Sequence, residues 1–218
     1  MTGLVTNLLD MARLQAGGVQ LSRQWLMLEE VVGAAMRASR RRLAQHPVHE
    51  HLPPDLPLLQ LDAVLMERLF TNLFENAAKY AGANSSLDIS ANTVTVDGKS
   101  FVRVNVDDHG PGLPAGMEKR IFEKFTRGEK ESAKPGIGLG LAICRAIVNA
   151  HGGEIGAENR LVSGGTDGTV VQGARFWFTL PAGEAPPGPE TLVDESSGES
   201  EHIGNPTDGD PTTEEHSA

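Results

Sequence analysis

The pattern of apolar and polar residues is most regular between Leu65 and Tyr80, where apolar side chains recur every third or fourth position. This spacing predicts a helix with one buried side, because such positions share a helix face. Four polar residues fall together on the neighbouring arc: Asn72, Asn76, Lys79 and Tyr80. Solvated charges usually lie opposite the buried side, so amides placed beside it indicate the edge of a pocket. Taken alone, the pattern fits two surface asparagines near a helix end equally well.

The rest of the pattern predicts further helices and several strands. Helical spacing covers residues 29–43 and 138–151, and Asp62 is the expected N-cap of the central helix. Two alternating stretches, 87–96 and 101–107, are joined by Asp97-Gly98, which is typical of a hairpin. Shorter extended segments are expected at 19–28, 48–52, 58–61, 154–158 and 173–180.

The two ends of the chain differ from its middle. Residues 4–15 have helical spacing, and we interpret residues 1–16 as a short helix separate from a domain at 17–182. Of the 29 acidic residues, ten lie in residues 183–218, which contain no Lys or Arg. We expect this acidic tail to be disordered. The rest of the chain then holds 29 − 10 = 19 acids against 19 bases, and this balance does not suggest a nucleic-acid surface.

Composition also bounds the compartment. Cys144 is the single cysteine, so no internal disulfide can form, and its apolar neighbours predict a buried thiol. No apolar run reaches the length of a membrane span. We therefore expect a cytoplasmic chain. The histidines 46, 49 and 51 could mimic a metal cluster, but the alternation with Pro and Glu favours surface positions.

Three later stretches carry candidate chemistry: residues 107–112 (DDHGPG), 121–127 (IFEKFTR) and 136–140 (GIGLG). Asp108 ends a predicted strand, and its carboxylate could accept a hydrogen bond from an adenine amino group; a simple turn Asp before Gly is the alternative. Gly136, Gly138, Leu139 and Gly140 lead into a helix, whose first unpaired amides can bind an anion. No Gly-Lys-Ser/Thr follows, which excludes a P-loop, and no strand precedes the glycines, which argues against a dinucleotide fold.

Taken in order, Asn-x-x-x-Asn, Asp-x-Gly-x-Gly, Phe-x-x-Phe and Gly-x-Gly-x-Gly resemble the N, G1, F and G2 boxes of the ATP-binding domain of sensor histidine kinases. The resemblance covers about residues 56–181. It implies a Bergerat (GHKL) fold: a two-layer α/β sandwich in which a mixed, mainly antiparallel sheet is covered by three helices. ATP and Mg²⁺ would be bound between the central helix and a mobile lid at residues 109–135.

The resemblance also implies roles for individual residues. Asn76 would bind Mg²⁺, with Asn72 supporting it one turn earlier, and Lys79 and Arg127 would contact phosphate. Tyr80 would flank the base or ribose, while Asp108, Gly110 and Gly112 would bind adenine. Phe122 and Phe125 would hold the lid by packing. Related ATPases such as gyrase have Glu as a water-activating base at the position of Asn72; an Asn cannot act as a base, which favours phosphoryl transfer over hydrolysis.

The sequence of the first third of the chain, including LLDMARLQAG and WLMLEEVVGAA, resembles the potassium-transport (Kdp) branch of these kinases. The expected partners are a histidine-bearing hairpin domain of the same kinase and a response regulator, in a parent protein that can be anchored in the inner membrane. None of the seven histidines has the neighbours of the family's phosphoacceptor, so we expect the acceptor outside this chain. We expect the chain itself to be a monomer or weak homodimer. Two alternatives stay open: a nucleotide-responsive interaction module without catalysis, and a serine protein kinase of the same fold.

Overall fold

The computed structural model describes residues 21–82, 84–126, 138–163 and 169–183. Its elements follow one another as β1 (Gln24–Leu26), α2 (Leu28–Ser39), β2 (Val48–His51), β3 (Leu59–Leu61), α3 (Ala63–Tyr80), β4 (Leu87–Val96), β5 (Lys99–Asp108), η1 (Arg120–Phe122), α4 (Gly140–Ala150), β6 (Ile155–Ser163) and β7 (Thr169–Pro181). The predicted first helix, Arg127, Gly136 and the tail from 184 lie outside the described residues.

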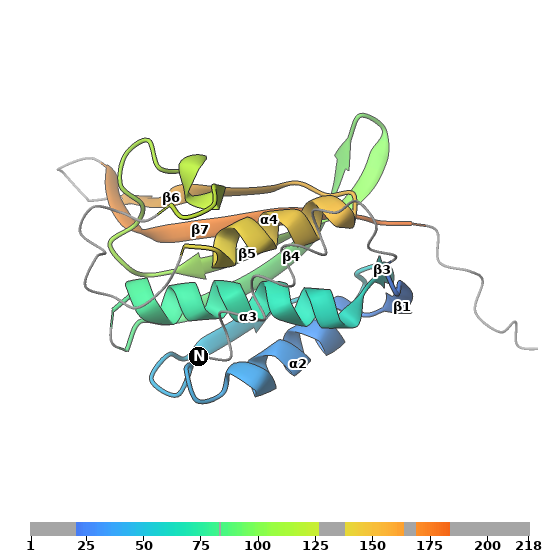
Figure 1. Ribbon diagram of the computed structural model, residues 1–218, viewed down its shortest axis with the longest axis horizontal. Coiled ribbons are helices and arrows are strands. Elements are labelled where there is room, and N and C mark those ends of the chain that lie inside the picture. The colour runs from blue at the N-terminus through green and yellow to red at the C-terminus, as the bar shows by residue number, and fades with distance from the viewer. Residues whose placement is uncertain (1–20, 83, 127–137, 164–168, 184–218) are drawn as a thin grey trace, which may run out of the picture. The chain divides into compact units, whose positions relative to one another are not determined.

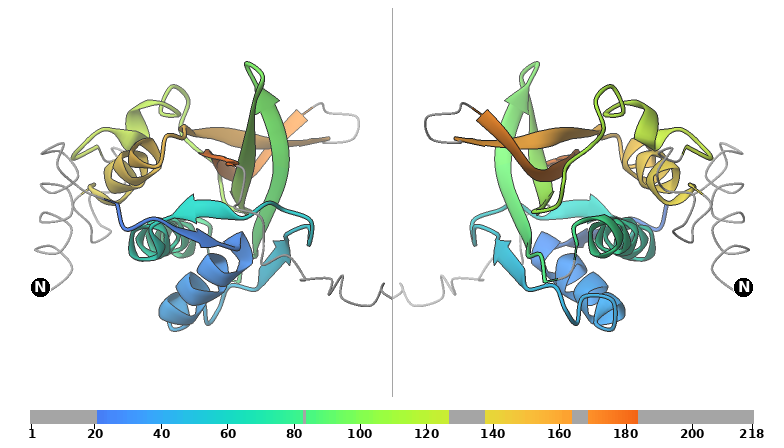
Figure 2. Two further views of the ribbon diagram at one scale, coloured as in Figure 1. Left: turned by 90° about the vertical axis from the view of Figure 1, so that its right-hand side faces the viewer. Right: turned by 90° about the vertical axis from the view of Figure 1, so that its left-hand side faces the viewer.

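A five-stranded sheet forms one layer of the domain, in the order β2-β4-β5-β7-β6. The β2–β4 pair is parallel and the other pairs are antiparallel. Helices α2, α3 and α4 cover one face of this sheet, as the views in Figures 1 and 2 show. This arrangement confirms the predicted two-layer sandwich with a mixed, mainly antiparallel sheet and three covering helices.

Helix α3 packs against the sheet, and its N-terminus is capped as the sequence predicts. The Oδ1 atom of Asp62 accepts a hydrogen bond from the backbone amide of Leu65 at 3.1 Å. Its buried side includes Phe70, whose ring meets that of Phe178 on β7 edge-on, with 5.6 Å between the ring centroids. Because α3 is fixed by this packing, the polar residues on its neighbouring arc are held on a rigid support.

The strands show two features that the sequence pattern did not predict. The segments at 48–52 and 58–61 belong to different sheets: β2 joins the main sheet, whereas β3 pairs with β1 in a separate two-stranded sheet. Strands β6 and β7 also extend well beyond the predicted 154–158 and 173–180. A register shift between Asn159 and Leu161 breaks the simple alternation there, so the added length was invisible in the sequence pattern.

One expected surface residue is buried. His46 is 7% exposed, and its Nδ1 atom lies 2.9 Å from the carbonyl oxygen of Ser85. His49 and His51 are exposed, as predicted. The expectation of a surface position is therefore wrong for His46, which ties the start of β2 to the loop after α3. Within the described part of the chain, no group of three His, Cys, Asp or Glu side chains could hold a metal ion.

Candidate functional site

Asp108, the last residue of β5, is 6% exposed. Its Oδ1 atom accepts two backbone hydrogen bonds, from Gly110 N at 2.9 Å and from Ala174 N at 3.0 Å. No described residue donates a hydrogen bond to Oδ2, and Oδ2 is not among the fully enclosed unpaired atoms of the described residues. The carboxylate is therefore held through one oxygen, and its other oxygen accepts no hydrogen bond from the described residues.

The turn after Asp108 lies against the end of α3. A Cβ atom at Gly110 would lie 2.6 Å from Cα of Ala81 and 3.2 Å from the carbonyl oxygen of Tyr80. Gly112 has a φ of +79°, and a Cβ there would meet Asn159 Oδ1 and Val171 Cγ1, both at 2.5 Å. The two glycines are thus required by close contacts on both sides of the turn.

The polar arc of α3 follows the helix from its middle to its end. Asn72 is 6% exposed, and its Nδ2 atom donates to the carbonyl oxygen of Gly140 at 3.4 Å. Asn76 is half-buried, and its amide makes no hydrogen bond with the described residues. Lys79 Nζ donates to the hydroxyl of Tyr80 at 2.8 Å and lies 4.7 Å from the centroid of its ring. Asn76 therefore lies one helical turn after Asn72, which contacts the start of α4, and one turn before Tyr80, which the loop after Asp108 approaches.

Helix α4 begins beside this arc. Gly138 has a φ of +73°, and a Cβ there would lie 2.7 Å from the carbonyl oxygen of Thr126. The carbonyl oxygen of Gly138 accepts a hydrogen bond from Phe125 N at 3.0 Å. Leu139 is buried as the residue preceding the helix, whereas Gly140 is half-exposed next to Asn72. The structure thus brings the end of the Phe-x-x-Phe segment against the glycines that lead into α4.

The two phenylalanines of that segment behave differently. Phe122 is 3% exposed and belongs to the core, which agrees with the predicted packing role. Phe125 is 65% exposed, with a φ of +62°. The expectation that Phe125 holds the lid by packing its ring is wrong in this structure, because a left-handed backbone at this residue turns the chain back toward Gly138 while the ring stays in solvent.

The single cysteine is inert, as predicted. Cys144 on α4 is fully buried beside α3, and its Sγ atom lies 3.7 Å from the carbonyl oxygen of Leu69. Burial raises the pKa of the thiol to about 12, although a hydrogen bond with Asn72 opposes the shift. The thiol is therefore protonated at neutral pH and supplies no nucleophile.

Sequence reasoning missed the charged residues behind Asp108. Arg175 Nε and Nη2 donate to the two oxygens of Asp107 at 2.8 and 2.7 Å, and Arg160 Nε lies 3.3 Å from Asp107 Oδ2. These hydrogen bonds to Asp107 raise the pKa of the Arg175 guanidinium above its ordinary value. Arg160 Nη1 also donates to the carbonyl oxygen of Asp108 at 3.2 Å. No local motif marks these residues, because the contacts join β5 to strands more than 50 positions later.

The opposite ends of α3 and α4 are joined around His151. This residue is 3% exposed; its Nε2 atom accepts from Asp62 N at 3.0 Å, so Nδ1 carries the proton and donates to the carbonyl oxygen of Ile147 at 2.8 Å. Burial lowers the pKa of His151 below its ordinary value. Arg23 Nη2 donates to the carbonyl oxygen of Ala150 at 3.0 Å. The imidazole is therefore neutral and structural.

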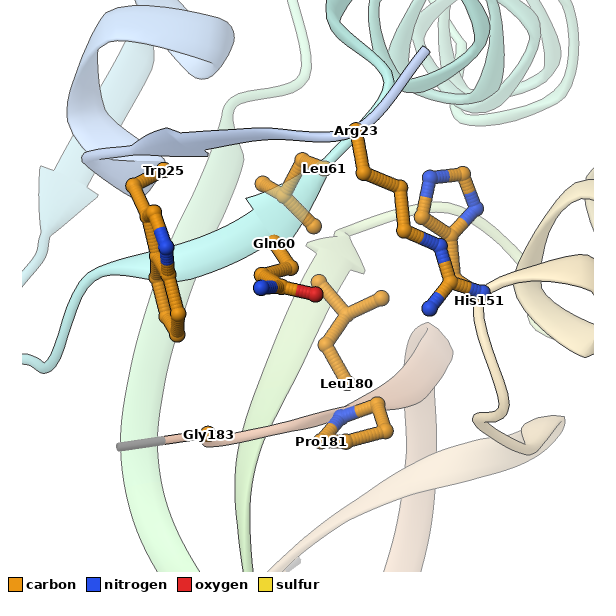
Figure 3. Close-up of a pocket in the computed structure, with 8 residues that line it drawn as sticks. All are labelled: Arg23, Trp25, Gln60, Leu61, His151, Leu180, Pro181 and Gly183. Carbon is orange, nitrogen blue, oxygen red and sulfur yellow. The ribbon is translucent and has the colours of Figure 1, made fainter. Parts of the chain in front are cut away.

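A cavity of about 200 Å³ lies beside His151 (Figure 3). Trp25 and Gln60 of the small sheet, Arg23, and Leu180 near the end of β7 line it. The cavity is at the start of α3 and the end of α4, whereas the predicted nucleotide-binding residues are at the end of α3 and the start of α4. It is therefore not the site that the sequence motifs define.

Residues 61–184 match the family model described as histidine kinase-, DNA gyrase B-, and HSP90-like ATPase. The match takes in more than half of the chain, so the chain belongs to this ATPase family.

Its relatives narrow the comparison further. The chain is 51% identical over 185 residues to the sensor protein KdpD of Escherichia coli (strain K12) and 33% identical over 180 residues to the sensor protein KdpD of Clostridium acetobutylicum. These alignments cover 85% and 82% of this chain but only 19% of each relative. The chain therefore spans about a fifth of the length of these sensor proteins.

A solved structure has the same architecture. The crystal structure of full-length ShkA in complex with AMPPNP superposes with a TM-score of 0.68 at 29% identity, covering 85% of this chain and 36% of that one.

Among the residues that our structure describes, no helix is both long and apolar enough to cross a membrane.

Proposed function

We propose that this chain is the ATP-binding catalytic part of a sensor histidine kinase. It binds ATP at the site formed by Asp108, the polar arc of α3 and the start of α4, and it transfers the γ-phosphoryl group to a histidine outside these 218 residues. The family match and the two KdpD relatives support this assignment. The KdpD similarity also supports a role in potassium or osmotic regulation.

The observation that carries the proposal is the orientation of Asp108. Its Oδ1 atom is committed to two backbone amides, so Oδ2 is the acceptor left for a ligand. Adenine offers an amino group at the position where guanine has a carbonyl oxygen, and a fixed carboxylate oxygen can pair with the amino group only. Asp108 would therefore select adenine, with Gly110 and Gly112 allowing the backbone to lie close to the base.

Asn76 fits a magnesium ion that arrives with the nucleotide. Mg²⁺ prefers oxygen ligands and usually keeps water and phosphate oxygens, with few ligands from the protein. The Asn76 amide makes no hydrogen bond with the described residues, so its oxygen is available. When bound, Mg²⁺ would neutralise charge on the phosphate oxygens. Within our proposal, Asn76 holds the ion and Asn72 supports the helix segment that carries it.

The phosphate end of the site would use cations and backbone amides. Lys79 stands at the end of α3, and the first amides of α4, at Gly140 and beyond, have no partner within the helix and could donate to an anion. The proposed phosphate-binding end also includes Gly136, Gly138, Leu139 and Arg127. In the reaction, an imidazole nitrogen of the acceptor attacks the γ-phosphorus, the bond to the bridging oxygen breaks, and ADP leaves with that electron pair. The protein contributes position and charge neutralisation.

The proposed partners follow from the reaction. A histidine-bearing hairpin domain of the same kinase supplies the acceptor, and a response regulator takes the phosphoryl group onward. The chain would act on the cytoplasmic side of a parent kinase anchored in the inner membrane, and on its own it would be a monomer or weak homodimer.

The test is transfer in trans from labelled ATP to a separately supplied hairpin domain. We expect acid-labile label on the hairpin and none on this chain, and no label on a hairpin whose acceptor His is replaced by Gln. ATP binding without transfer would favour the interaction module. Acid-stable label on a partner serine would favour a serine kinase of the same fold.

A further inference from the structure

The turn that follows Asp108 is held from the side by Asn159 on β6. Leu113 N donates to Asn159 Oδ1 at 2.6 Å, and Asn159 Nδ2 donates back to the carbonyl oxygen of Leu113 at 3.0 Å. The side-chain amide thus pairs with the backbone of Leu113 as a neighbouring strand would. Both polar groups of one loop residue are satisfied by a single side chain, which fixes the position of that residue.

The fit between Asn159 and this turn depends on Gly112. A Cβ at Gly112 would lie 2.5 Å from Asn159 Oδ1, so the amide can reach Leu113 only because residue 112 has no side chain. The strand pairing at Asn159 also connects it to Asp108. Asn159 pairs with Ala174 across β6 and β7, and Ala174 N donates to Asp108 Oδ1.

The next residue supports the other end of the turn. Arg160 is 19% exposed; its Nη1 atom donates to the carbonyl oxygen of Asp108 at 3.2 Å, and its Nε atom contacts Asp107. Two consecutive residues at the register shift of β6 therefore hold the backbone before and after Gly110 and Gly112. An irregular strand that holds both ends of one loop favours a positioning role over simple sheet pairing.

We propose that Asn159 is a positioning residue for nucleotide binding, acting through the Asp108–Leu113 turn without touching the nucleotide. This inference rests on the proposed function, because it concerns the same site. Removing the amide leaves Leu113 without its two side-chain hydrogen bonds and lets the turn move relative to the locked carboxylate of Asp108.

The test compares ATP affinity by calorimetry in the wild-type chain, Asn159→Ala and Asn159→Asp. Each lost hydrogen bond corresponds to about a fivefold change, so we expect Asn159→Ala to bind ATP about five- to thirtyfold more weakly. Asn159→Asp should also bind weakly, because a carboxylate cannot donate to the Leu113 carbonyl. Asn92→Ala, a change at an exposed Asn of β4, is the matched control and should bind as the wild type does.

A second measurement separates positioning from general loss of structure. In the double variant Asp108→Asn/Asn159→Ala, the two losses in ATP affinity should be less than multiplicative, because both act on one turn. Multiplicative losses, or wild-type affinity in Asn159→Ala, would overturn the proposal. If the wild-type chain binds no ATP, the proposed function fails and this inference fails with it. If the wild type binds ATP, faster exchange of the Leu113 amide in Asn159→Ala together with weaker ATP binding supports the inference. Unchanged exchange overturns the inference and leaves the proposed function standing.

Discussion

Replacing Asp108 by Asn changes one atom of the candidate site in a direction that the structure dictates. Gly110 N and Ala174 N both donate to Oδ1. The amide oxygen of the new Asn must take that position, because an NH₂ group there would face two N–H donors. The NH₂ group is then placed where Oδ2 was, and in the proposed ATP complex it would meet the adenine amino group donor to donor.

The magnitude follows from counting contacts. The two backbone hydrogen bonds survive, so we expect the free energy of unfolding to change by less than about 1 kcal/mol. The ligand loses one hydrogen bond to a charged acceptor, about 1.5–3 kcal/mol, which corresponds to an ATP affinity about 10- to 150-fold weaker. Asp108→Ala is different: it leaves the half-buried amide of Gly110 and the buried amide of Ala174 unpaired, the latter at a cost of about 1–3 kcal/mol, and should also destabilise the fold.

Calorimetric titration with ATP, combined with urea denaturation, separates these effects. The expected pattern is weak ATP binding with a stable fold in Asp108→Asn, and loss of both in Asp108→Ala. Unchanged ATP affinity in Asp108→Asn would refute the assignment of adenine recognition to this carboxylate. A large loss of stability in Asp108→Asn would refute the argument that Oδ1 alone holds the loop.

Three further predictions concern other parts of the domain. Asn76→Ala should weaken binding of ATP with Mg²⁺ far more than binding of magnesium-free ATP, and equal losses in calorimetry would make Asn76 structural. Burial lowers the pKa of His151 in the folded chain below its ordinary value of 6.5. As pH falls below about 6.5, the imidazole therefore takes up a proton only in the unfolded chain, and the folded state loses stability until the pH reaches the folded-state pKa. Above about pH 6.5 the stabilisation from neutral His151 is complete. Urea denaturation of His151→Gln at about pH 7.5 and pH 5.5 should show a smaller loss on acidification than the wild type or the exposed-site control His49→Gln, and an equal loss would contradict the linkage. Backbone amides of residues 109–126 should exchange more slowly when a non-hydrolysable ATP analogue is added, and exchange unaffected by the analogue would argue against a lid that closes on nucleotide.

Local signals in the sequence were sufficient for much of the fold. The cap at Asp62, the apolar face of α3 and the Asp97-Gly98 turn, where both residues have positive φ, depend on neighbours within a few positions and were predicted correctly. The resemblance of four motifs then selected Asp108 and the arc of α3. The structure places Gly140, and Gly110 of the turn after Asp108, against α3, while the roles of these residues stay predictions.

The supporting contacts could not be predicted in this way. Asn159 reaches a residue 46 positions earlier, and Arg175 pairs with a carboxylate 68 positions earlier. Such pairs depend on the order of strands in the sheet and on a register shift, neither of which leaves a periodic trace in one sequence. The same applies to His46, whose burial depends on the loop at Ser85.

The pairing of β5 with β7 also has a consequence for how the domain is made. The β4–β5 hairpin closes over a two-residue turn, whereas β7 must return across a long stretch of chain before Ala174 can meet Asp108. Closing long loops costs more entropy and is slower than closing short ones. During synthesis the hairpin can therefore form well before the carboxylate acquires its second backbone donor. Nucleotide affinity would then appear only at the last stage of folding, which would make ATP a reporter, and a stabiliser, of the completed chain.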